Sequence, residues 1–213
     1  MMIGQDEVLW SEEPAAASRA KHLLVLLHGA TSDEHALFDR LAPLLPADVV
    51  VVSPRGPVPE GDGYSWASPH DRADARADAA VAALGNSIAQ SFLAWLDVIP
   101  AFRSVGVLGA SQGACIALQA LRAAPGRFAY AINLSGYSLP GAEVGDRELR
   151  RRKLDVFWGR GLFDEVIPTD YVDRTASWLP GHSTITERIY DIGHDVCAAE
   201  LDDVAAFVSA RIR

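Results

Sequence analysis

Continuous apolar runs are the feature of this sequence that most restricts its fold. "HLLVLLHGA" (22–30) has the length of a strand and ends in small residues, and "ADVVVVSPRG" (47–56) repeats this form further along the chain. Strands that are apolar on both faces are typical of a parallel sheet covered by helices, whereas a half-solvated antiparallel strand alternates. The further runs of this kind are "SVGVLG" (104–109), "FAYAINLSG" (128–136), "LDVFWG" (154–159) and, more weakly, "TITERIYDIG" (184–193).

Helical patterns lie between these runs. Apolar side chains recur at three- and four-residue steps over 84–99 and over 201–212, which predicts amphipathic helices packed on the core. Because right-handed crossovers put helices on both faces of the sheet, we predict an α/β protein. It is an open, doubly wound, mostly parallel sheet in a single domain over residues 1–213. Functional residues in such sheets follow the carboxyl ends of the strands, here Leu27, Val52, Leu108, Leu134, Trp158 and Tyr190.

Composition and charge narrow the function classes. The 213 residues are 49% hydrophobic and 22% charged, as in an ordinary globular domain. The net charge of −9, with no long basic run, argues against a nucleic-acid partner. The acidic start "MMIGQDEVLWSEEP" does not resemble a secretion signal, and no uninterrupted apolar run approaches 18 residues. We therefore expect a cytoplasmic protein without stable membrane association.

The stretch "GASQGA" (109–114) holds Ser111 between two glycines at a predicted strand-to-helix turn. A turn that lifts a serine above the sheet strains its backbone and brings Gly109 and Gly113 close together, where larger side chains would collide. The bare pattern arises by chance in roughly one chain in ten of this composition, so the strand and helix around it carry the argument. Ser111 is the candidate nucleophile.

A serine nucleophile needs a histidine base, and the base needs a carboxylate that fixes its tautomer. On this type of sheet both follow the serine in the chain, the acid first, each just after a strand. Only His182 and His194 follow Ser111. His194 lies in "YDIGHDV", directly after the last predicted strand, and is the candidate base. His182 precedes that strand, at the opposite edge of the sheet.

The candidate acid is Asp164. "VFWGRGLFDEVIP" (156–168) places this residue in the loop after a strand, and Pro168 with Thr169 opens the next helix. Glu165 is the remaining competitor. Other aspartates in this part of the chain are weaker candidates by position, namely Asp155, Asp170, Asp191 and Asp195.

Hydrolysis through a tetrahedral intermediate also needs backbone N–H donors for the developing negative charge. Gln112, at the start of the helix after the serine, should supply one. The loop "LLHGATSDEH" (26–35) should supply the second, from Ala30 or, as the alternative, Thr31. His28 ends a buried strand, so we interpret it as a ligand of the loop backbone rather than a second base.

With these residues identified, the chain resembles the α/β-hydrolase superfamily, and specifically the phospholipase/carboxylesterase family that includes acyl-protein thioesterases. The segments that carry the resemblance, from about residue 23 to the C-terminus, are "LLHGATSDE", "VVSPRGPVPEGDGYSWAS", "GASQGA", "GLFDEVIP" and "GHDV". The resemblance implies a catalytic triad of Ser111, Asp164 and His194, with Ala30 and Gln112 as oxyanion-hole donors. The "HGxG" form common in that family reads "HGAT" here.

Leu134, at the end of one predicted strand, and Leu154, at the start of the next, are only 20 residues apart. This spacing leaves no room for a cap domain between the two strands and predicts an open, shallow cleft. The residues expected to bind substrate are Thr31, Trp66, Leu162 and Phe163, of which the last three would form an apolar acyl-binding wall. Core or rim packing is the alternative for these three.

The predicted function is hydrolysis of a carboxylic ester or thioester with a short to medium acyl chain, through an acyl-enzyme intermediate. The alternatives are an acyltransferase or peptidase that uses the same triad, or a hydrolase-like scaffold that binds without turnover. The expected partner is a small-molecule ester or thioester. No metal or organic cofactor is expected, and a homodimer is left open.

The two cysteines, Cys115 and Cys197, are too few for a disulfide framework and lack the CxxC spacing of a metal or redox site. Each follows a candidate catalytic residue by three or four positions. Reduced, packed thiols are the favoured interpretation, and a redox-sensitive pair is the alternative.

Overall fold

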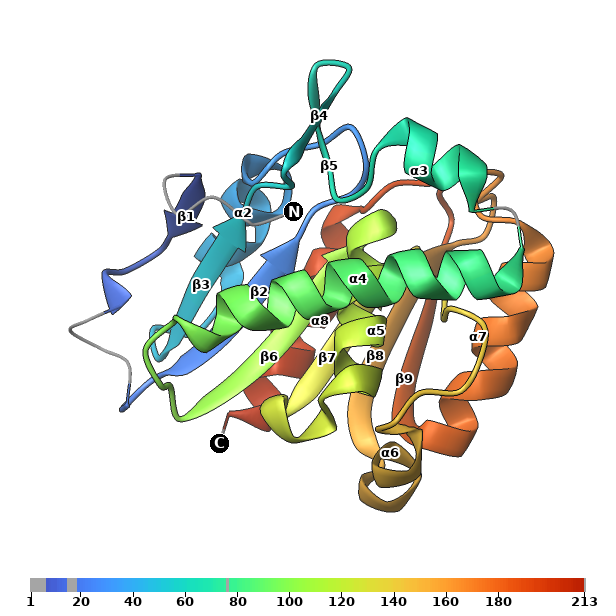
Figure 1. Ribbon diagram of the computed structural model, residues 1–213. Helices are drawn as coiled ribbons and strands as arrows, with labels where there is room; N and C mark the ends of the chain where they lie inside the picture. The colour runs from blue at the N-terminus through green and yellow to red at the C-terminus, as the bar shows by residue number, and fades with distance from the viewer. Residues whose placement is uncertain (1–6, 15–18, 76, 213) are drawn as a thin grey trace.

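The computed structural model describes residues 7–14, 19–75 and 77–212 (Figure 1). A seven-stranded sheet in the order β1-β3-β2-β6-β7-β8-β9 forms the centre of the molecule, and only β1 runs antiparallel to its neighbour. The parallel strands coincide with the predicted apolar runs. The strands are β1 (Val8–Trp10), β2 (His22–Leu27), β3 (Val49–Pro54), β6 (Ser104–Ala110), β7 (Tyr130–Leu134), β8 (Leu154–Gly161) and β9 (Ser183–Tyr190).

Helices cover both faces of this sheet, as predicted. Figure 1 shows α4 and α5 in front of the strands and α8 behind them. The front face packs against α4 (Asp78–Asp97), α5 (Gln112–Ala123), α6 (Asp146–Arg152) and α7 (Thr169–His182). The rear face packs against α2 (His35–Leu41) and α8 (Ala198–Arg211).

The central strand β2 shows why its sequence is continuously apolar. Leu23, Val25 and Leu27 belong to the front core cluster, whereas Leu24 and Leu26 belong to the rear one. All five side chains are at most 1% exposed. Each such burial contributes roughly 1.5 to 3 kcal/mol before entropy is counted, so both faces of the strand select large apolar residues.

Several short elements have no counterpart in the predicted pattern. The turn-rich segment after β3 forms a hairpin of β4 (Val58–Glu60) and β5 (Gly63–Ser65), followed by α3 (Pro69–Asp74). Two 3-10 helices, η1 (Ala42–Leu44) and η2 (Pro125–Arg127), complete the described elements. Between β7 and β8 the described chain contains α6 as its one regular element, so the fold has no cap domain.

By length and composition alone, α4 could cross a membrane. The core helix of a globular protein passes the same test, and α4 buries one face in the front cluster through Ala89, Phe92, Leu93, Trp95 and Leu96. Packing on the sheet therefore accounts for the apolar residues of this helix.

Candidate active site

Ser111 lies at the sharp turn between β6 and α5, with φ 50° and ψ −116°. A non-glycine residue rarely adopts a positive φ, and such strain gathers at functional sites. The flanking glycines make the turn sterically feasible. A Cβ on Gly109 would lie 2.2 Å from the Gly113 backbone, and a Cβ on Gly113 would lie 2.1 Å from the Leu27 oxygen. The predicted close approach of the two glycines is therefore present.

Three predicted side chains from distant parts of the chain meet above the carboxyl edge of the sheet. Ser111 Oγ lies 2.9 Å from His194 Nε2, and His194 Nδ1 lies 2.8 Å from Asp164 Oδ2. The other carboxylate oxygen of Asp164 accepts the backbone N–H groups of Val166 and Ile167. Because the carboxylate is held on both sides, it can keep the proton of His194 on Nδ1 and leave Nε2 free to accept one.

Backbone contacts between two loops hold the acid and the histidine in register. The N–H groups of Leu162 and Phe163 donate to the carbonyls of Tyr190 and Ile192, at 2.8 and 3.0 Å. Close packing adds to this pairing, since a Cβ on Gly161 would lie 2.1 Å from the Gly193 oxygen. The loops after β8 and β9 therefore form one unit.

The alternative acid and the alternative base lie outside this hydrogen-bonded arrangement. Glu165 is exposed beside the loop, whereas the Asp164 side chain is 9% exposed and bound. His182 ends α7, where its Nδ1 hydrogen-bonds the Trp178 carbonyl and its ring stacks on the Trp178 indole. The structure thus brings together the residues chosen from the sequence and leaves out their rivals.

The candidate oxyanion donors are the backbone N–H groups of Ala30 and Gln112. Ala30 and Ser111 line the same pocket, of about 220 Å³, and Gln112 follows Ser111 at the start of α5. The alternative donor, Thr31, already donates its N–H to Ser65 Oγ at 3.0 Å. Among the described residues, no acceptor forms a hydrogen bond with the N–H groups of Ala30 and Gln112. This contrast favours Ala30 over Thr31.

His28 binds the loop backbone, as predicted. Its Nε2 accepts the Gly56 N–H at 2.8 Å, so the ring proton lies on Nδ1 and is donated to the Gly29 carbonyl at 2.7 Å. Burial lowers the pKa of this imidazole, which is 1% exposed. A neutral ring fixed at both nitrogens is not free to act as a second base.

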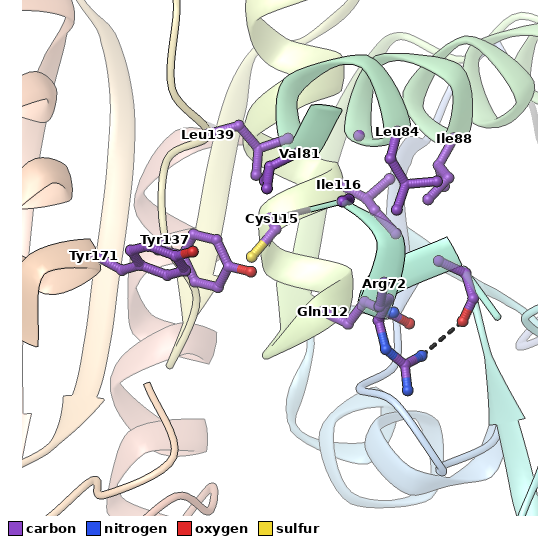
Figure 2. Close-up of a pocket in the computed structure, with 13 residues that line it drawn as sticks. Arg72, Val81, Leu84, Ile88, Gln112, Cys115, Ile116, Tyr137, Leu139 and Tyr171 are labelled. Carbon is purple, nitrogen blue, oxygen red and sulfur yellow. Dashed lines mark hydrogen bonds between the residues drawn. The ribbon is translucent and has the colours of Figure 1, made fainter. Parts of the chain in front are cut away.

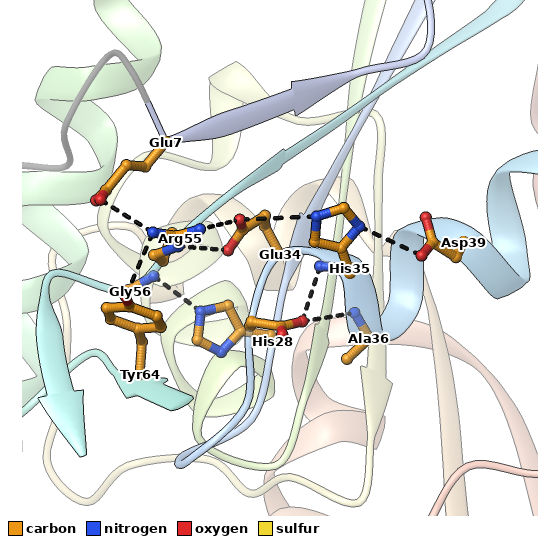
Figure 3. A network of polar contacts seen from close by, with 10 residues as sticks. Glu7, His28, Glu34, His35, Ala36, Asp39, Arg55, Gly56 and Tyr64 are labelled. Atoms are coloured by element: carbon orange, nitrogen blue, oxygen red, sulfur yellow. Dashed lines mark hydrogen bonds and ion pairs between the residues drawn. The ribbon is translucent and has the colours of Figure 1, made fainter. Parts of the chain in front are cut away.

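A polar network supports the same loop from the side of α2 (Figure 3). Arg55, just after β3, donates through Nε to Glu34 Oε2 at 2.7 Å and stacks 4.5 Å above the Tyr64 ring. The hydrogen bond from Arg55 holds the pKa of the buried Glu34 carboxyl below its ordinary value. Asp33 Oδ1 accepts the first N–H groups of α2. The loop between β2 and α2 is therefore anchored at both ends.

A second, mostly apolar pocket lies on the front face beside the serine turn (Figure 2). Its volume is about 180 Å³. Gln112 and Cys115, which follow Ser111 on α5, line the end of the pocket nearest the serine turn. The apolar lining comes from α4, α5 and the segment after β7: Val81, Leu84, Ile88, Ile116, Tyr137 and Leu139. The sequence pattern does not predict this pocket: the helical spacing of Leu84 and Ile88 predicts core packing, and Val81, Tyr137 and Leu139 carry no signal of their own.

The expected acyl-binding wall needs correction. Trp66 is 3% exposed, and its indole N–H donates to the His28 carbonyl at 2.8 Å, so this ring is a core residue. Leu162 and Phe163 are 58% and 61% exposed on the acid loop, outside the pocket of Ser111 and the apolar pocket, and Leu162 lines a further pocket together with Asp164. Thr31 is exposed at the edge of the loop that carries Ala30. Core packing therefore describes Trp66, whereas substrate binding by Leu162 and Phe163 stays a prediction.

Both thiols are free. Cys115 lines the apolar pocket, and Figure 2 shows its sulfur directed toward Tyr137. Burial raises the pKa of Cys115 to about 12, so the reactive thiolate is disfavoured. In the part of the chain that the structure describes, no three side chains of His, Cys, Asp or Glu are grouped to hold a metal ion.

A mostly parallel sheet of this order, with a strained serine after β6 and a histidine after the last strand, defines an α/β-hydrolase fold without a cap domain. The chain belongs to the phospholipase/carboxylesterase family, whose sequence model matches residues 12–212. It is therefore an esterase-type hydrolase.

Solved structures share this fold at low sequence identity. The Bacillus cereus carboxylesterase is 17% identical, with a TM-score of 0.69 over 96% of this chain and 93% of that chain. Esterase PE8 is 24% identical, with a TM-score of 0.68 over 96% and 97%. Arabidopsis thaliana SOBER1 is 15% identical, with a TM-score of 0.68 over 91% and 100%. At such identities the likeness establishes the fold alone. No curated protein matches the sequence.

Proposed function

We propose that this chain hydrolyses carboxylic esters or thioesters with short to medium acyl chains through an acyl-enzyme intermediate on Ser111. The observation that carries the proposal is the continuous hydrogen-bonded line from Ser111 Oγ through His194 to Asp164, at 2.9 and 2.8 Å. These distances lie within the reach that proton transfer requires. Membership of an esterase-type family agrees with this chemistry.

In the first half-reaction, His194 Nε2 accepts the Ser111 proton as Oγ attacks the carbonyl carbon. The carbonyl oxygen becomes an oxyanion, which the N–H groups of Ala30 and Gln112 stabilise. Collapse of this intermediate breaks the bond to the leaving alcohol or thiol, and His194 returns the proton to it. Water then repeats the sequence on the acyl-enzyme, releasing the acid and restoring Ser111. Asp164 holds the imidazole in the required tautomer throughout.

The apolar pocket beside Gln112 suits the acyl chain. An engineered apolar cavity of about 150 Å³ binds benzene, so a pocket of about 180 Å³ fits an acyl group of roughly six carbons. The pocket adjoins the turn through Gln112, whose N–H faces the same intermediate in the proposed mechanism. This pocket size supports the proposal of short to medium acyl chains.

The acyl-length assignment predicts a selectivity change on narrowing the pocket. Leu84→Phe on α4 should lower kcat/KM for a six-carbon ester by about tenfold and leave the acetyl ester within twofold, because only the longer chain needs the lost volume. Val98→Phe, at the exposed C-terminal end of α4, is the control. Equal losses for both esters in the Leu84 variant would place the acyl chain elsewhere.

Covalent labelling tests the nucleophile. A fluorophosphonate probe should form one adduct, on Ser111, located by peptide mass spectrometry. Ser111→Ala should abolish labelling and lower turnover by about 10⁴-fold or more without loss of folding. Ser177→Ala, which removes an exposed hydroxyl on α7, should leave both unchanged. A Ser111 variant that keeps a tenth of the activity would end the assignment, and an unlabelled, inactive wild type would favour a non-catalytic scaffold.

An acyltransferase or peptidase with the same triad is the second candidate. The acyl-enzyme is common to all three activities, so the acceptor distinguishes them. Adding alcohols, amines or peptides to the assay should leave the free acid as the main product if water is the natural acceptor.

A further inference from the structure

The β4–β5 hairpin contacts both halves of the candidate oxyanion hole. Ser65, the last residue of β5, accepts the Thr31 N–H on its Oγ at 3.0 Å. Trp66, the next residue, donates its backbone N–H to Gln112 Oε1 at 2.8 Å. The pair Ser32 and Tyr64 adds two backbone hydrogen bonds, of 3.1 and 2.7 Å. Two consecutive residues therefore hold the loop that carries Ala30 and the first residue of α5.

Thr31 is strained and needs support. Its φ is 58°, in the left-handed region that a β-branched residue rarely adopts. Such a conformation persists only where the surroundings hold it. The Thr31 N–H that Ser65 holds belongs to the Ala30–Thr31 peptide, which adjoins the Gly29–Ala30 peptide that carries the candidate oxyanion donor. Relaxation of Thr31 would let the Ala30–Thr31 peptide turn and would shift the adjoining peptide, whose N–H we place in the pocket that Ala30 shares with Ser111.

The hydroxyl of Ser65 is oriented so that its oxygen can accept the Thr31 N–H. Ser65 is 0% exposed and has a single proton, which it donates to Glu60 Oε2 at 2.6 Å. Arg72 on α3 holds the Glu60 carboxylate with two hydrogen bonds, of 2.9 and 2.6 Å. With its proton committed to Glu60, the hydroxyl presents a lone pair to the Thr31 N–H.

We propose that Ser65 is a positioning residue for the oxyanion hole. Oriented by Glu60, it holds Thr31 in the left-handed conformation and so keeps the Ala30 N–H aligned with that of Gln112. Ser65 acts through Thr31: the hydrogen bonds of its hydroxyl go to Thr31 and Glu60, and none in the described part of the chain joins it to the triad. The proposal rests on the proposed serine-hydrolase function, because the hole serves that reaction.

The test is steady-state kinetics of Ser65→Ala with active sites titrated by the fluorophosphonate probe. A misaligned donor should lower kcat and kcat/KM together, by about 10- to 100-fold, which is less than the 10²- to 10³-fold cost of removing a donor. KM should stay within twofold. Ser68→Ala is the matched control: this serine caps α3 in the same segment but does not touch the loop of Ala30. It should lower stability and leave kcat unchanged.

Ser65→Ala with wild-type kcat per titrated site would overturn the proposal while the hydrolase function stands. An equal kcat loss in Ser68→Ala would also overturn it, because the effect would then be general to the segment. A wild type that neither labels nor turns over would overturn both. If Ser65→Ala does not fold, Glu60→Gln decides in the same way: it frees the hydroxyl to rotate and should lower kcat two- to fivefold at unchanged KM.

Discussion

The roles of single residues in this site are set by where their polar atoms are bound, and two adjacent carboxylates show the contrast. Asp164 accepts His194 Nδ1 and two backbone N–H groups, whereas its neighbour Glu165 is exposed. Chemical type and sequence position are nearly the same for the two. Only the folded backbone distinguishes them.

Asp164→Asn should therefore lower kcat by about 10⁴-fold, since an amide that donates to His194 would favour the wrong tautomer. Glu165→Gln should keep kcat within about twofold. Steady-state kinetics of the two variants, with folding checked by circular dichroism, gives the comparison. Comparable losses in both would mean that the acid has been misassigned.

The residues that could be predicted from the sequence are those whose position alone defines them. Ser111, Asp164 and His194 each follow a recognisable apolar run, so the sheet had to bring them to one edge. The partner of the Thr31 N–H could not be predicted, because Ser65 lies 34 residues away in a hairpin without periodicity. The sequence leaves Trp66 open between a pocket wall and the core, because an indole suits both; its burial and its hydrogen bond to the His28 carbonyl place it in the core.

Among the secondary-structure elements, the length of an element decides whether it can be predicted from the sequence. Strands of five to eight residues and helices of twelve or more carry a readable period, as in β6 to β9, α4, α5 and α8. β1, β4 and β5 have three residues each, and α6 is polar through most of its seven residues. Such short elements depend on tertiary contacts, which no local pattern records.

Arg122 provides one such contact, between α5, the segment after β7, and α6. Its side chain is 0% exposed; it pairs with Asp146 through two 3.0 Å bonds and donates to the Leu139 and Gly141 carbonyls. Arg122→Leu leaves a nearly buried carboxylate and two carbonyls without this donor. We expect a loss of about 3 to 5 kcal/mol in the free energy of unfolding, measured with urea.

The matched control is Arg127→Leu, which removes a partner of Asp97 at the surface. Both side chains of that pair are more than 40% exposed, so the expected loss is below about 1 kcal/mol. A similar loss in both variants would show that burial does not set the value of the Arg122 pair.

For the whole molecule, two buried titratable groups, His28 and Glu200, change the free energy of unfolding in opposite directions as the pH rises. Burial lowers the pKa of His28, so the unfolded chain takes up its proton first as the pH falls below about 6.5. The contribution of neutral His28 to the free energy of unfolding is therefore complete above the pKa of the unfolded chain and is lost as the pH falls below it. Burial raises the pKa of Glu200 to about 7 from an ordinary value of 4.5. The Glu200 side chain lies in the first turn of α8, against Gly159 of β8.

Between pH 4.5 and 7 the unfolded chain has lost the Glu200 proton and the folded chain keeps it. Folding therefore binds a proton in this pH window. The contribution of Glu200 to the free energy of unfolding is complete below pH 4.5 and is lost as the pH rises through 7. Arg40 eases ionisation of this carboxyl, while Asp195 and Asp203 oppose it. Glu200→Gln is neutral at every pH. Its stability relative to wild type should thus rise by about 1 to 3 kcal/mol between pH 4.5 and pH 8.

Urea unfolding of the two proteins at both pH values measures this difference, and any fixed effect of the amide cancels because only the change with pH is compared. Asp202→Asn, exposed on the same helix, should show no such change. A constant offset between Glu200→Gln and wild type across the range would mean that Glu200 ionises at its ordinary pKa. The surroundings of Glu200 beside the strand that leads to Asp164 would then stabilise the charged carboxylate as well as water does, so its ionisation would leave the free energy of unfolding unchanged.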